Sequence, residues 1–174
     1  MKYWCLLIAL VATTPSVYAD SVLTPRPLDP WADESFDRGL THSALVRELV
    51  ATLEASNVVV HIETSTQMPF GIGGLTKFVT SQHGYRYVRI IVARDLSPYD
   101  RAAVLGHELQ HACEIARSTA DTEGAVRTLF ERLGHADSKQ PNYFETEAAV
   151  LAGRQVSREL RHKATSRLAV EGLR

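Results

Sequence analysis

Two histidines and a glutamate lie close together in the middle of the 174-residue chain, and their types and spacing could support metal chemistry. His107, Glu108 and His111 form the pattern His-Glu-x-x-His. Residues four positions apart lie on one face of an α-helix, so the two imidazoles can be directed at one metal ion. Neutral imidazole is a standard ligand of Zn²⁺. The spacing therefore predicts that His107 and His111 bind zinc, while Glu108 accepts a proton from water as general base.

The sequence around this motif predicts that it lies in a helix over 98–117. Ser97 is a suitable N-cap, Pro98 fits the first helical position, and Asp100 favours the positive end of the helix dipole. Apolar residues then recur at helical spacing at Leu105, Leu109, Ala112 and Ala116. The alternative is a surface helix whose histidines are only solvated.

A catalytic zinc site has three protein ligands and one open position, so one more ligand is needed. Glu145 and Glu147, which we expect near the start of a helix over 142–162, are candidates. We favour Glu145, because small residues follow it at helical spacing and would let this helix approach the motif closely. Those residues are Ala148, Ala149, Ala152 and Gly153. Alternatively, Glu145 could form a capping box with Asn142, and Glu147 could be a solvated charge near Arg154.

Other residues with metal-binding or catalytic side chains have less support. A third histidine ligand at His83 or His135 has no supporting spacing. Cys113 follows His111 by two positions, which points it off the histidine face, so we interpret it as a small buried residue. Candidate donors to a developing oxyanion are Tyr143, Tyr99 and His135.

The same residues carry a resemblance to a known family. Over about half its length the chain resembles small gluzincin-type zinc metallopeptidases and is similar to short secreted bacterial metallopeptidase-like proteins. The resemblance is carried by Gly-His-Glu-Leu-Gln-His at 106–111 and by the later Phe-Glu-Thr. The resemblance implies that His107, His111 and Glu145 bind zinc. It also implies peptide-bond hydrolysis by a zinc-activated water, with Glu108 as the base.

One position departs from that family pattern. The family often has an aspartate four residues after its glutamate ligand, and this chain has Ala149 there. A carboxylate commonly orients a ligating histidine, and loss of such a partner lowers metal affinity by about 10–100-fold. Glu114 and Asp121 are candidates to replace it. A zinc-binding or interaction protein with weak or no catalysis, and a metal-free binding module, are the alternative functions.

The N-terminus has the features of a signal peptide over 1–19. Lys2 precedes an apolar run over 4–11, and small residues lead up to Ala19, after which we expect cleavage. The prediction is a secreted or periplasmic protein with no membrane span after cleavage; a retained anchor is the alternative. The formal net charge of −1 gives no indication of a nucleic-acid partner, and we expect a peptide or protein substrate.

The rest of the chain predicts one α+β domain of a minimal zincin-like kind. We expect a small, mostly antiparallel sheet packed on the motif helix, with an N-terminal helix and two further C-terminal helices. A proline-rich arm over 20–40, extended and loosely held in its first part, precedes the domain at 41–162, and 163–174 is a tail. Expected helices are 41–55, 98–117, 122–133 and 142–162, and expected strands are 57–64, 75–81 and 85–93. We expect the strand 85–93 to be an edge strand, with which a peptide substrate pairs backbone to backbone. The glycine-rich segment 70–75 is expected to be a flexible loop or a bulged strand that lines a cleft.

Overall fold

The computed structural model describes residues 25–136 and 143–171, and it is an α+β fold, as predicted. The predicted signal peptide, the first residues of the arm and the end of the tail lie outside the described residues. In chain order the elements are β1 (Arg26–Pro27), α1 (Pro30–His42), α2 (Ala44–Glu54), β2 (Val58–Ser65), β3 (Gly74–Gln82), β4 (Tyr85–Ala93), α3 (Pro98–Ala116), α4 (Glu123–Leu133), β5 (His135–Ala136), β6 (Phe144–Glu145) and α5 (Glu147–Glu171). Among the described residues, none of the helices is both long and apolar enough to cross a membrane.

The main sheet is mixed, so the prediction of a mostly antiparallel sheet is wrong. Its strand order is β1-β2-β4-β3, with β1 and β4 parallel to β2 and only β3 antiparallel to β4. The hairpin of β3 and β4 was predictable, because His83 and Gly84 form its tight turn with φ angles of 52° and 81°. The parallel pairing of β2 with β4 is a long-range contact, and the local sequence pattern of either strand does not encode it.

This strand order also changes which strand is exposed at the edge next to the motif helix. The predicted edge, β4, is a central strand, and its Val88, Ile90 and Val92 are at most 1% exposed. The outer strand is β3, whose residues are all exposed or half-buried. A strand that pairs on both sides and packs on helices requires a continuous apolar face, which β4 has and β3 lacks.

The described part of the proline-rich arm, residues 25–40, is packed into the domain, in contrast to the loosely held segment that the sequence suggested. Helix α1 begins directly after Asp29, whose carboxylate accepts hydrogen bonds from the backbone N–H groups of Trp31 and Ala32. Pro30 occupies the first turn, where a missing N–H costs nothing. Ala32 and Phe36 then enter the core, so the arm forms part of the domain.

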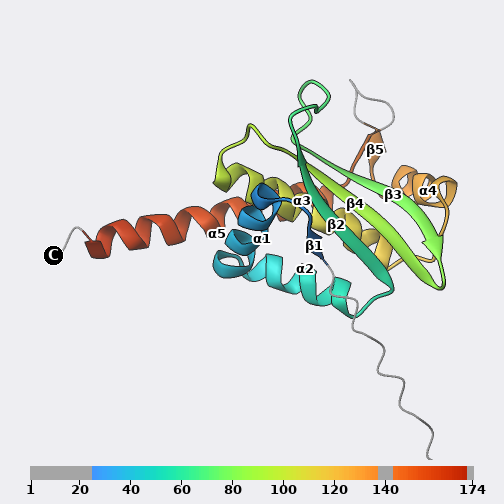
Figure 1. Ribbon diagram of the computed structural model, residues 1–174, viewed down its shortest axis with the longest axis horizontal. Helices are drawn as coiled ribbons and strands as arrows, with labels where there is room; N and C mark the ends of the chain where they lie inside the picture. The colour runs from blue at the N-terminus through green and yellow to red at the C-terminus, as the bar shows by residue number, and fades with distance from the viewer. Residues whose placement is uncertain (1–24, 137–142, 172–174) are drawn as a thin grey trace, which may run out of the picture.

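Helix α3 is the central element of the fold (Figure 1). It lies against β2, β3 and β4 and is packed in turn by α1, α2 and α5. Its observed bounds confirm the predicted helix, and the hydroxyl of Ser97 accepts the N–H of Asp100 at 3.2 Å as the N-cap. The side chains of Leu105, Leu109 and Ile115 are buried in the core.

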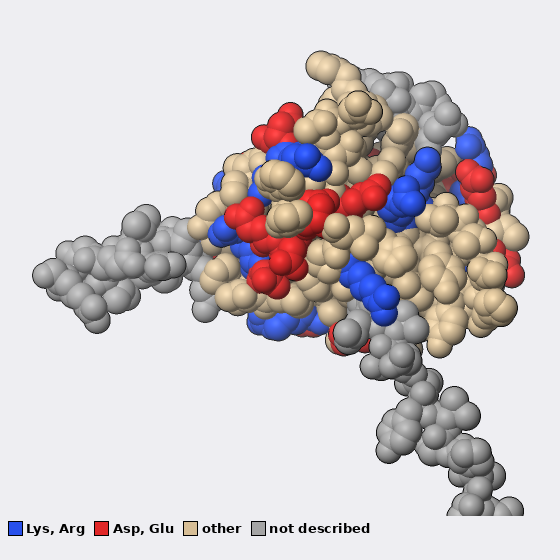
Figure 2. Space-filling view, viewed as in Figure 1, with Lys and Arg blue, Asp and Glu red and all other residues tan. Residues whose placement is uncertain are grey.

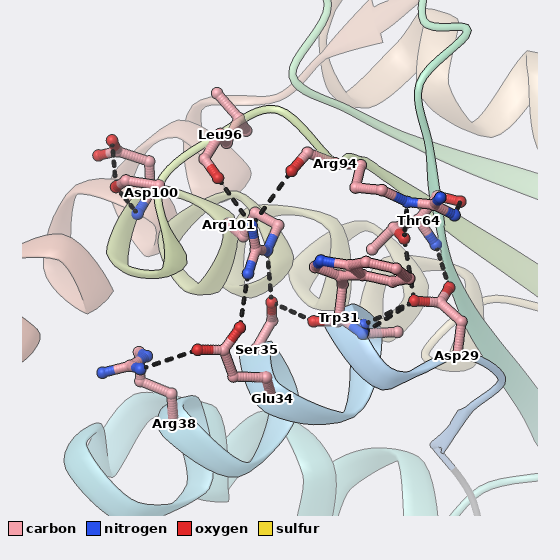
Figure 3. A network of polar contacts seen from close by, with 12 residues as sticks. Asp29, Trp31, Glu34, Ser35, Arg38, Thr64, Arg94, Leu96, Asp100 and Arg101 are labelled. Carbon is pink, nitrogen blue, oxygen red and sulfur yellow. Dashed lines mark hydrogen bonds and ion pairs between the residues drawn. The ribbon is translucent and has the colours of Figure 1, made fainter.

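The N-terminal end of α3 is fixed by a buried arginine (Figure 3). Arg101 is 5% exposed, and it donates hydrogen bonds to the Leu96 carbonyl at 2.8 Å and the Ser35 hydroxyl at 3.2 Å. It also forms an ion pair of 2.6 Å with Glu34, which is paired with Arg38 as well. The contacts of Arg101 with Ser35 and Glu34 tie α1 to the start of α3. Figure 2 shows acidic and basic side chains mixed over the face of the molecule that is seen in Figure 1.

A second buried arginine fixes the C-terminal end of the same helix. Arg86 on β4 donates to the carbonyl oxygens of Ile115, Ser118 and Ala116 at 2.7, 2.8 and 3.1 Å. It also bonds the Asn57 side chain at 2.7 Å. Carbonyl groups at a helix end lack partners within the helix, so this guanidinium satisfies them and sets the position of α3 on the sheet.

Candidate metal centre

The three predicted ligands lie together in the folded protein. One ligand atom each of His107, His111 and Glu145 lies within 4.8 Å of the others, so this group could hold a metal ion. The two imidazole rings project from successive turns of α3, with centroids 4.9 Å apart. The His107 Nε2 atom lies 3.4 Å from the Glu145 Oε1 atom. This carboxylate and the charge of Glu108 outweigh burial and raise the pKa of His107 above its usual value.

Glu145 reaches this group from a strand, which differs from the predicted helical position. It is the second residue of β6, where it pairs with His135 of β5, and α5 begins only at Glu147. A capping box of Glu145 with Asn142 would require both in the first turn of a helix, and Asn142 lies outside the described residues. The residue that caps α5 is Thr146, whose hydroxyl accepts the N–H of Ala149 at 3.1 Å. Glu147 is exposed at the start of α5, outside the group.

The predicted close approach of α5 to the motif helix is confirmed. A Cβ atom placed on Gly153 would lie 3.2 Å from the Cβ of His107, and one on Gly106 would lie 2.6 Å from a methyl group of Val156. Ala149 and Ala152 are buried in the same contact region. Side chains without bulk therefore allow α3 and α5 to pack together beside the two histidines.

Glu114 is the carboxylate that contacts a histidine of the group, a role for which the sequence left Glu114 and Asp121 as candidates. Its Oε2 atom lies 2.9 Å from the Nδ1 atom of His111, and its Oε1 accepts a hydrogen bond from Thr146 at 2.7 Å. Burial alone would raise the pKa of Glu114, but these two hydrogen bonds hold it below its usual value. An ionised Glu114 favours a proton on Nδ1 of His111, which leaves Nε2 free to bind a metal. Asp121, the other candidate, is exposed and lies near Arg86.

Glu108 is buried between the group and the edge strand. It is 4% exposed, and burial raises its pKa above the usual value, although the two imidazoles and a hydrogen bond from Thr76 oppose this rise. The Thr76 hydroxyl on β3 donates to Glu108 Oε2 at 2.7 Å. A Cβ atom on Gly74 would lie 2.5 Å from Glu108 Oε1, so the strand backbone passes this carboxylate at a distance that only glycine allows.

Two hollows flank the group, one beside each histidine. The larger, of about 510 Å³, lies on the His111 side between β3 and α4. Its lining includes the aromatic side chains of Phe78, Phe130 and Phe144. The smaller, of about 350 Å³, lies on the His107 side against the glycine-rich segment and α5. Glu108 and Glu145 line both hollows, so the group lies where the two meet.

The glycine-rich segment lines this cleft, as predicted, through Ile72 and Gly74. Residues 70–73 form a loop, and Gly74 begins β3. In the loop's tight turn the Ile72 N–H donates to the Pro69 carbonyl at 3.0 Å, and Gly71 has a φ of 78°. The turn presents Phe70 with 94% of its surface exposed. A positive φ at this turn position favours glycine, which explains Gly71.

Of the three residues considered as oxyanion donors, one lies at the hollows beside the group and two lie elsewhere. Tyr143 lines the larger hollow beside Glu145. Tyr99 lies outside the lining of both hollows and packs under the guanidinium of Arg38. His135 is exposed and lines neither hollow. Tyr143 is therefore the one of the three that is placed at the site.

The remaining candidates for a ligand are elsewhere in the molecule. His83 is in the β3–β4 turn, and it does not belong to the group. Cys113 is fully buried with its Sγ atom 3.4 Å from the Leu49 carbonyl, and burial raises the pKa of its thiol to about 12. The interpretation of Cys113 as a small core residue is confirmed.

Comparison of the chain with protein-family models, with curated proteins and with solved structures found no match in any of the three. The indications of a function therefore come from the geometry and chemistry of the group of His107, His111 and Glu145.

Proposed function

We propose that this protein is a zinc-dependent metallopeptidase of the gluzincin type. The observation that carries the proposal is the convergence of His107, His111 and Glu145, with Glu108 buried beside them. Two imidazoles and one glutamate are a ligand set of catalytic zinc in peptidases. This donor set fits Zn²⁺, since one carboxylate with two nitrogen ligands is poorly suited to Ca²⁺ or Mg²⁺, which prefer more oxygen ligands.

The chain's own residues would divide the catalytic work. Zinc supplies Lewis acidity, which polarises a peptide carbonyl and makes water easier to deprotonate. Glu108 accepts the proton from water and passes it to the leaving amine, and burial, which raises its pKa above the usual value, makes it a stronger base. Thr76 holds the Glu108 carboxylate through its hydrogen bond. Tyr143, which lines the larger hollow, would donate a hydrogen bond to the developing oxyanion.

The edge strand β3 offers a binding surface for an extended peptide. It is the outer strand of the sheet, and its first residues, from Gly74 to Phe78, line the larger hollow. A peptide can add to such an edge through backbone hydrogen bonds, with its side chains entering the hollows on either side. In this proposal β3 takes the role that the sequence analysis gave to the strand 85–93.

The test is zinc analysis and peptide cleavage with the mature full-length chain, expected to begin after Ala19. We expect about one zinc per chain, lost in His107→Ala and Glu145→Ala variants, and cleavage of a broad peptide library. Glu108→Gln should retain zinc and lose cleavage, which separates the base from the ligands. Zinc binding without cleavage in the wild type would favour the alternative, a zinc-binding protein without catalysis. Absence of zinc even after reloading would contradict both.

A further inference from the structure

The smaller hollow, on the His107 side, contains one permanently charged cation. Its lining consists mostly of glycines and apolar side chains, and it also includes His107, Glu108 and Glu145. Arg154, one residue after the Gly153 that packs on His107, is the arginine in that lining. Glu147 was considered as a solvated charge near Arg154, and no hydrogen bond or ion pair joins the two side chains in the described part of the chain.

Arg154 is available for a ligand. Within the described residues its guanidinium forms no ion pair, no hydrogen bond and no stacking contact, and its side chain is exposed. By contrast, Arg101 and Arg86 are buried and fully engaged, and Arg127 pairs with Glu131. A third hollow, of about 420 Å³, continues from Arg154 along α5 past Arg158. A basic strip thus begins at the site and follows α5 outward.

We propose that Arg154 is a specificity residue that binds a carboxylate of the substrate on the His107 side of the cleaved bond. This inference rests on the proposed peptidase function. A guanidinium binds a carboxylate through two parallel hydrogen bonds, and it stays charged at any physiological pH. Gly71, Gly73 and Gly74 line the same hollow without side chains, which leaves room for the substrate's acidic group. The carboxylate can be a glutamate or aspartate side chain or the free C-terminus.

The first experiment uses the zinc-loaded full chain and a neutral ten-residue peptide blocked at both ends. A single Glu is placed at each position in turn, each peptide has a Gln twin, and the cut is located by mass spectrometry. We expect Glu at one position on one side of the cut to raise kcat/KM by about 10–100-fold over Gln, the range of a charge-assisted hydrogen bond. Arg154→Gln should abolish that preference, and Arg154→Glu should favour Lys there. Arg132→Gln, an exposed arginine of α4 outside the hollows, is the matched control.

A second arm separates the two sources of the carboxylate. The same neutral peptide is offered with a free C-terminal carboxylate or with a C-terminal amide. Preference for the free terminus that Arg154→Gln removes would assign Arg154 to recognition of a chain end, with cuts near that end. Preference for an internal Glu alone would assign it to an acidic side chain. Equal rates for every pair, in both wild type and variant, would overturn the proposal.

Two further readouts keep this proposal distinct from the peptidase function itself. If the wild type cleaves no peptide, binding of fluorescent Glu and Gln twins is measured by anisotropy. An Arg154-dependent preference for Glu would support the carboxylate site while the peptidase function fails, and equal affinities would reject it. Zinc content of Arg154→Gln must equal that of the wild type. Loss of zinc in this variant would mean that Arg154 supports the metal group, which would contradict a role in binding substrate.

Discussion

His111 is oriented by a carboxylate from its own helix, one turn further on. Glu114 contacts Nδ1 of His111, and Thr146 holds the second oxygen of Glu114 from the start of α5. Ala149 occupies the position where the resembling family often has aspartate, and it is fully buried against α3. At the residue scale, the carboxylate beside His111 therefore comes from Glu114 on α3, and the position of Ala149 on α5 supplies none.

Replacing Glu114 should weaken zinc binding without removing a ligand. In Glu114→Gln the amide no longer attracts the Nδ1 proton of His111 as a charged acceptor, so we expect zinc affinity to fall by about 10–100-fold. Competition with a chelator measures this change. Glu131→Gln, which alters an exposed glutamate of α4, is the control and should leave affinity unchanged. Equal affinities of Glu114→Gln and wild type would show that Glu114 does not orient the ligand.

At the scale of elements, the site depends on how closely β3 passes α3. Gly74 lies against both Glu108 and Val104, and a Cβ there would come within 2.5 Å of atoms of each. Gly73, its neighbour, is less constrained, because its Cβ would lie 3.4 Å from Val104. The two adjacent glycines thus form a matched pair. A Cβ on Gly74 would clash with the proposed base, Glu108, and a Cβ on Gly73 would not.

Gly74→Ala should displace the edge strand from the base. The added methyl group would push Glu108 or the strand out of position, so we expect a loss of about 1–3 kcal/mol in stability and a marked fall in kcat. Zinc content should be retained, because Gly74 contacts no proposed ligand at this distance. Gly73→Ala should have a much smaller effect on both. Thermal unfolding and peptide cleavage measure the two quantities, and similar results for the two variants would contradict the close-approach argument.

Arg86 makes a second prediction at this scale. Arg86→Met would leave the carbonyl oxygens at the end of α3 buried without donors, and we expect a loss of about 2–4 kcal/mol in the free energy of unfolding. Arg89→Met on the same strand is the control. Arg89 is exposed, and its ion pair with Glu63 is a long surface contact of 3.7 Å. That pair should contribute less than about 1 kcal/mol. Urea unfolding of both variants tests the difference, and equal losses would exclude a special role for Arg86.

At the scale of the whole molecule, the N-terminal segment and the sheet are joined through Asp29 (Figure 3). Its carboxylate caps α1 and accepts hydrogen bonds from the backbone N–H and the hydroxyl of Thr64, at 2.6 and 2.9 Å. Burial would raise the pKa of Asp29, but the hydrogen bonds from Thr64, Ala32 and Trp31 together hold it below its ordinary value of 3.8. The segment predicted as a loose arm is thus anchored to β2 and, through α1, to α3.

The lowered pKa of Asp29 predicts a pH dependence of stability. Its folded pKa lies below its unfolded pKa, so its contribution is fully present above about pH 4–5 and is lost as the pH falls through the folded value. Asp29→Asn should lose about 1–2 kcal/mol at pH 7, and the difference from wild type should shrink toward pH 3. Urea unfolding at both pH values measures this. A difference that stays constant with pH would contradict the role of the charged carboxylate.

The sequence by itself determined the helix of the motif, its N-cap and the placing of the two histidines on one face, because these depend on local spacing and capping. Only the tertiary structure decided that β3 rather than β4 is the edge, that Thr146 of the segment before α5 holds Glu114 beside His111, and that Glu145 reaches the group from a strand. These features are set by contacts between segments distant in sequence, such as the parallel pairing of β2 with β4 and the packing of α5 on α3. Local propensity does not encode such contacts, because their free energy comes from burial and hydrogen bonds that form only when the whole chain folds.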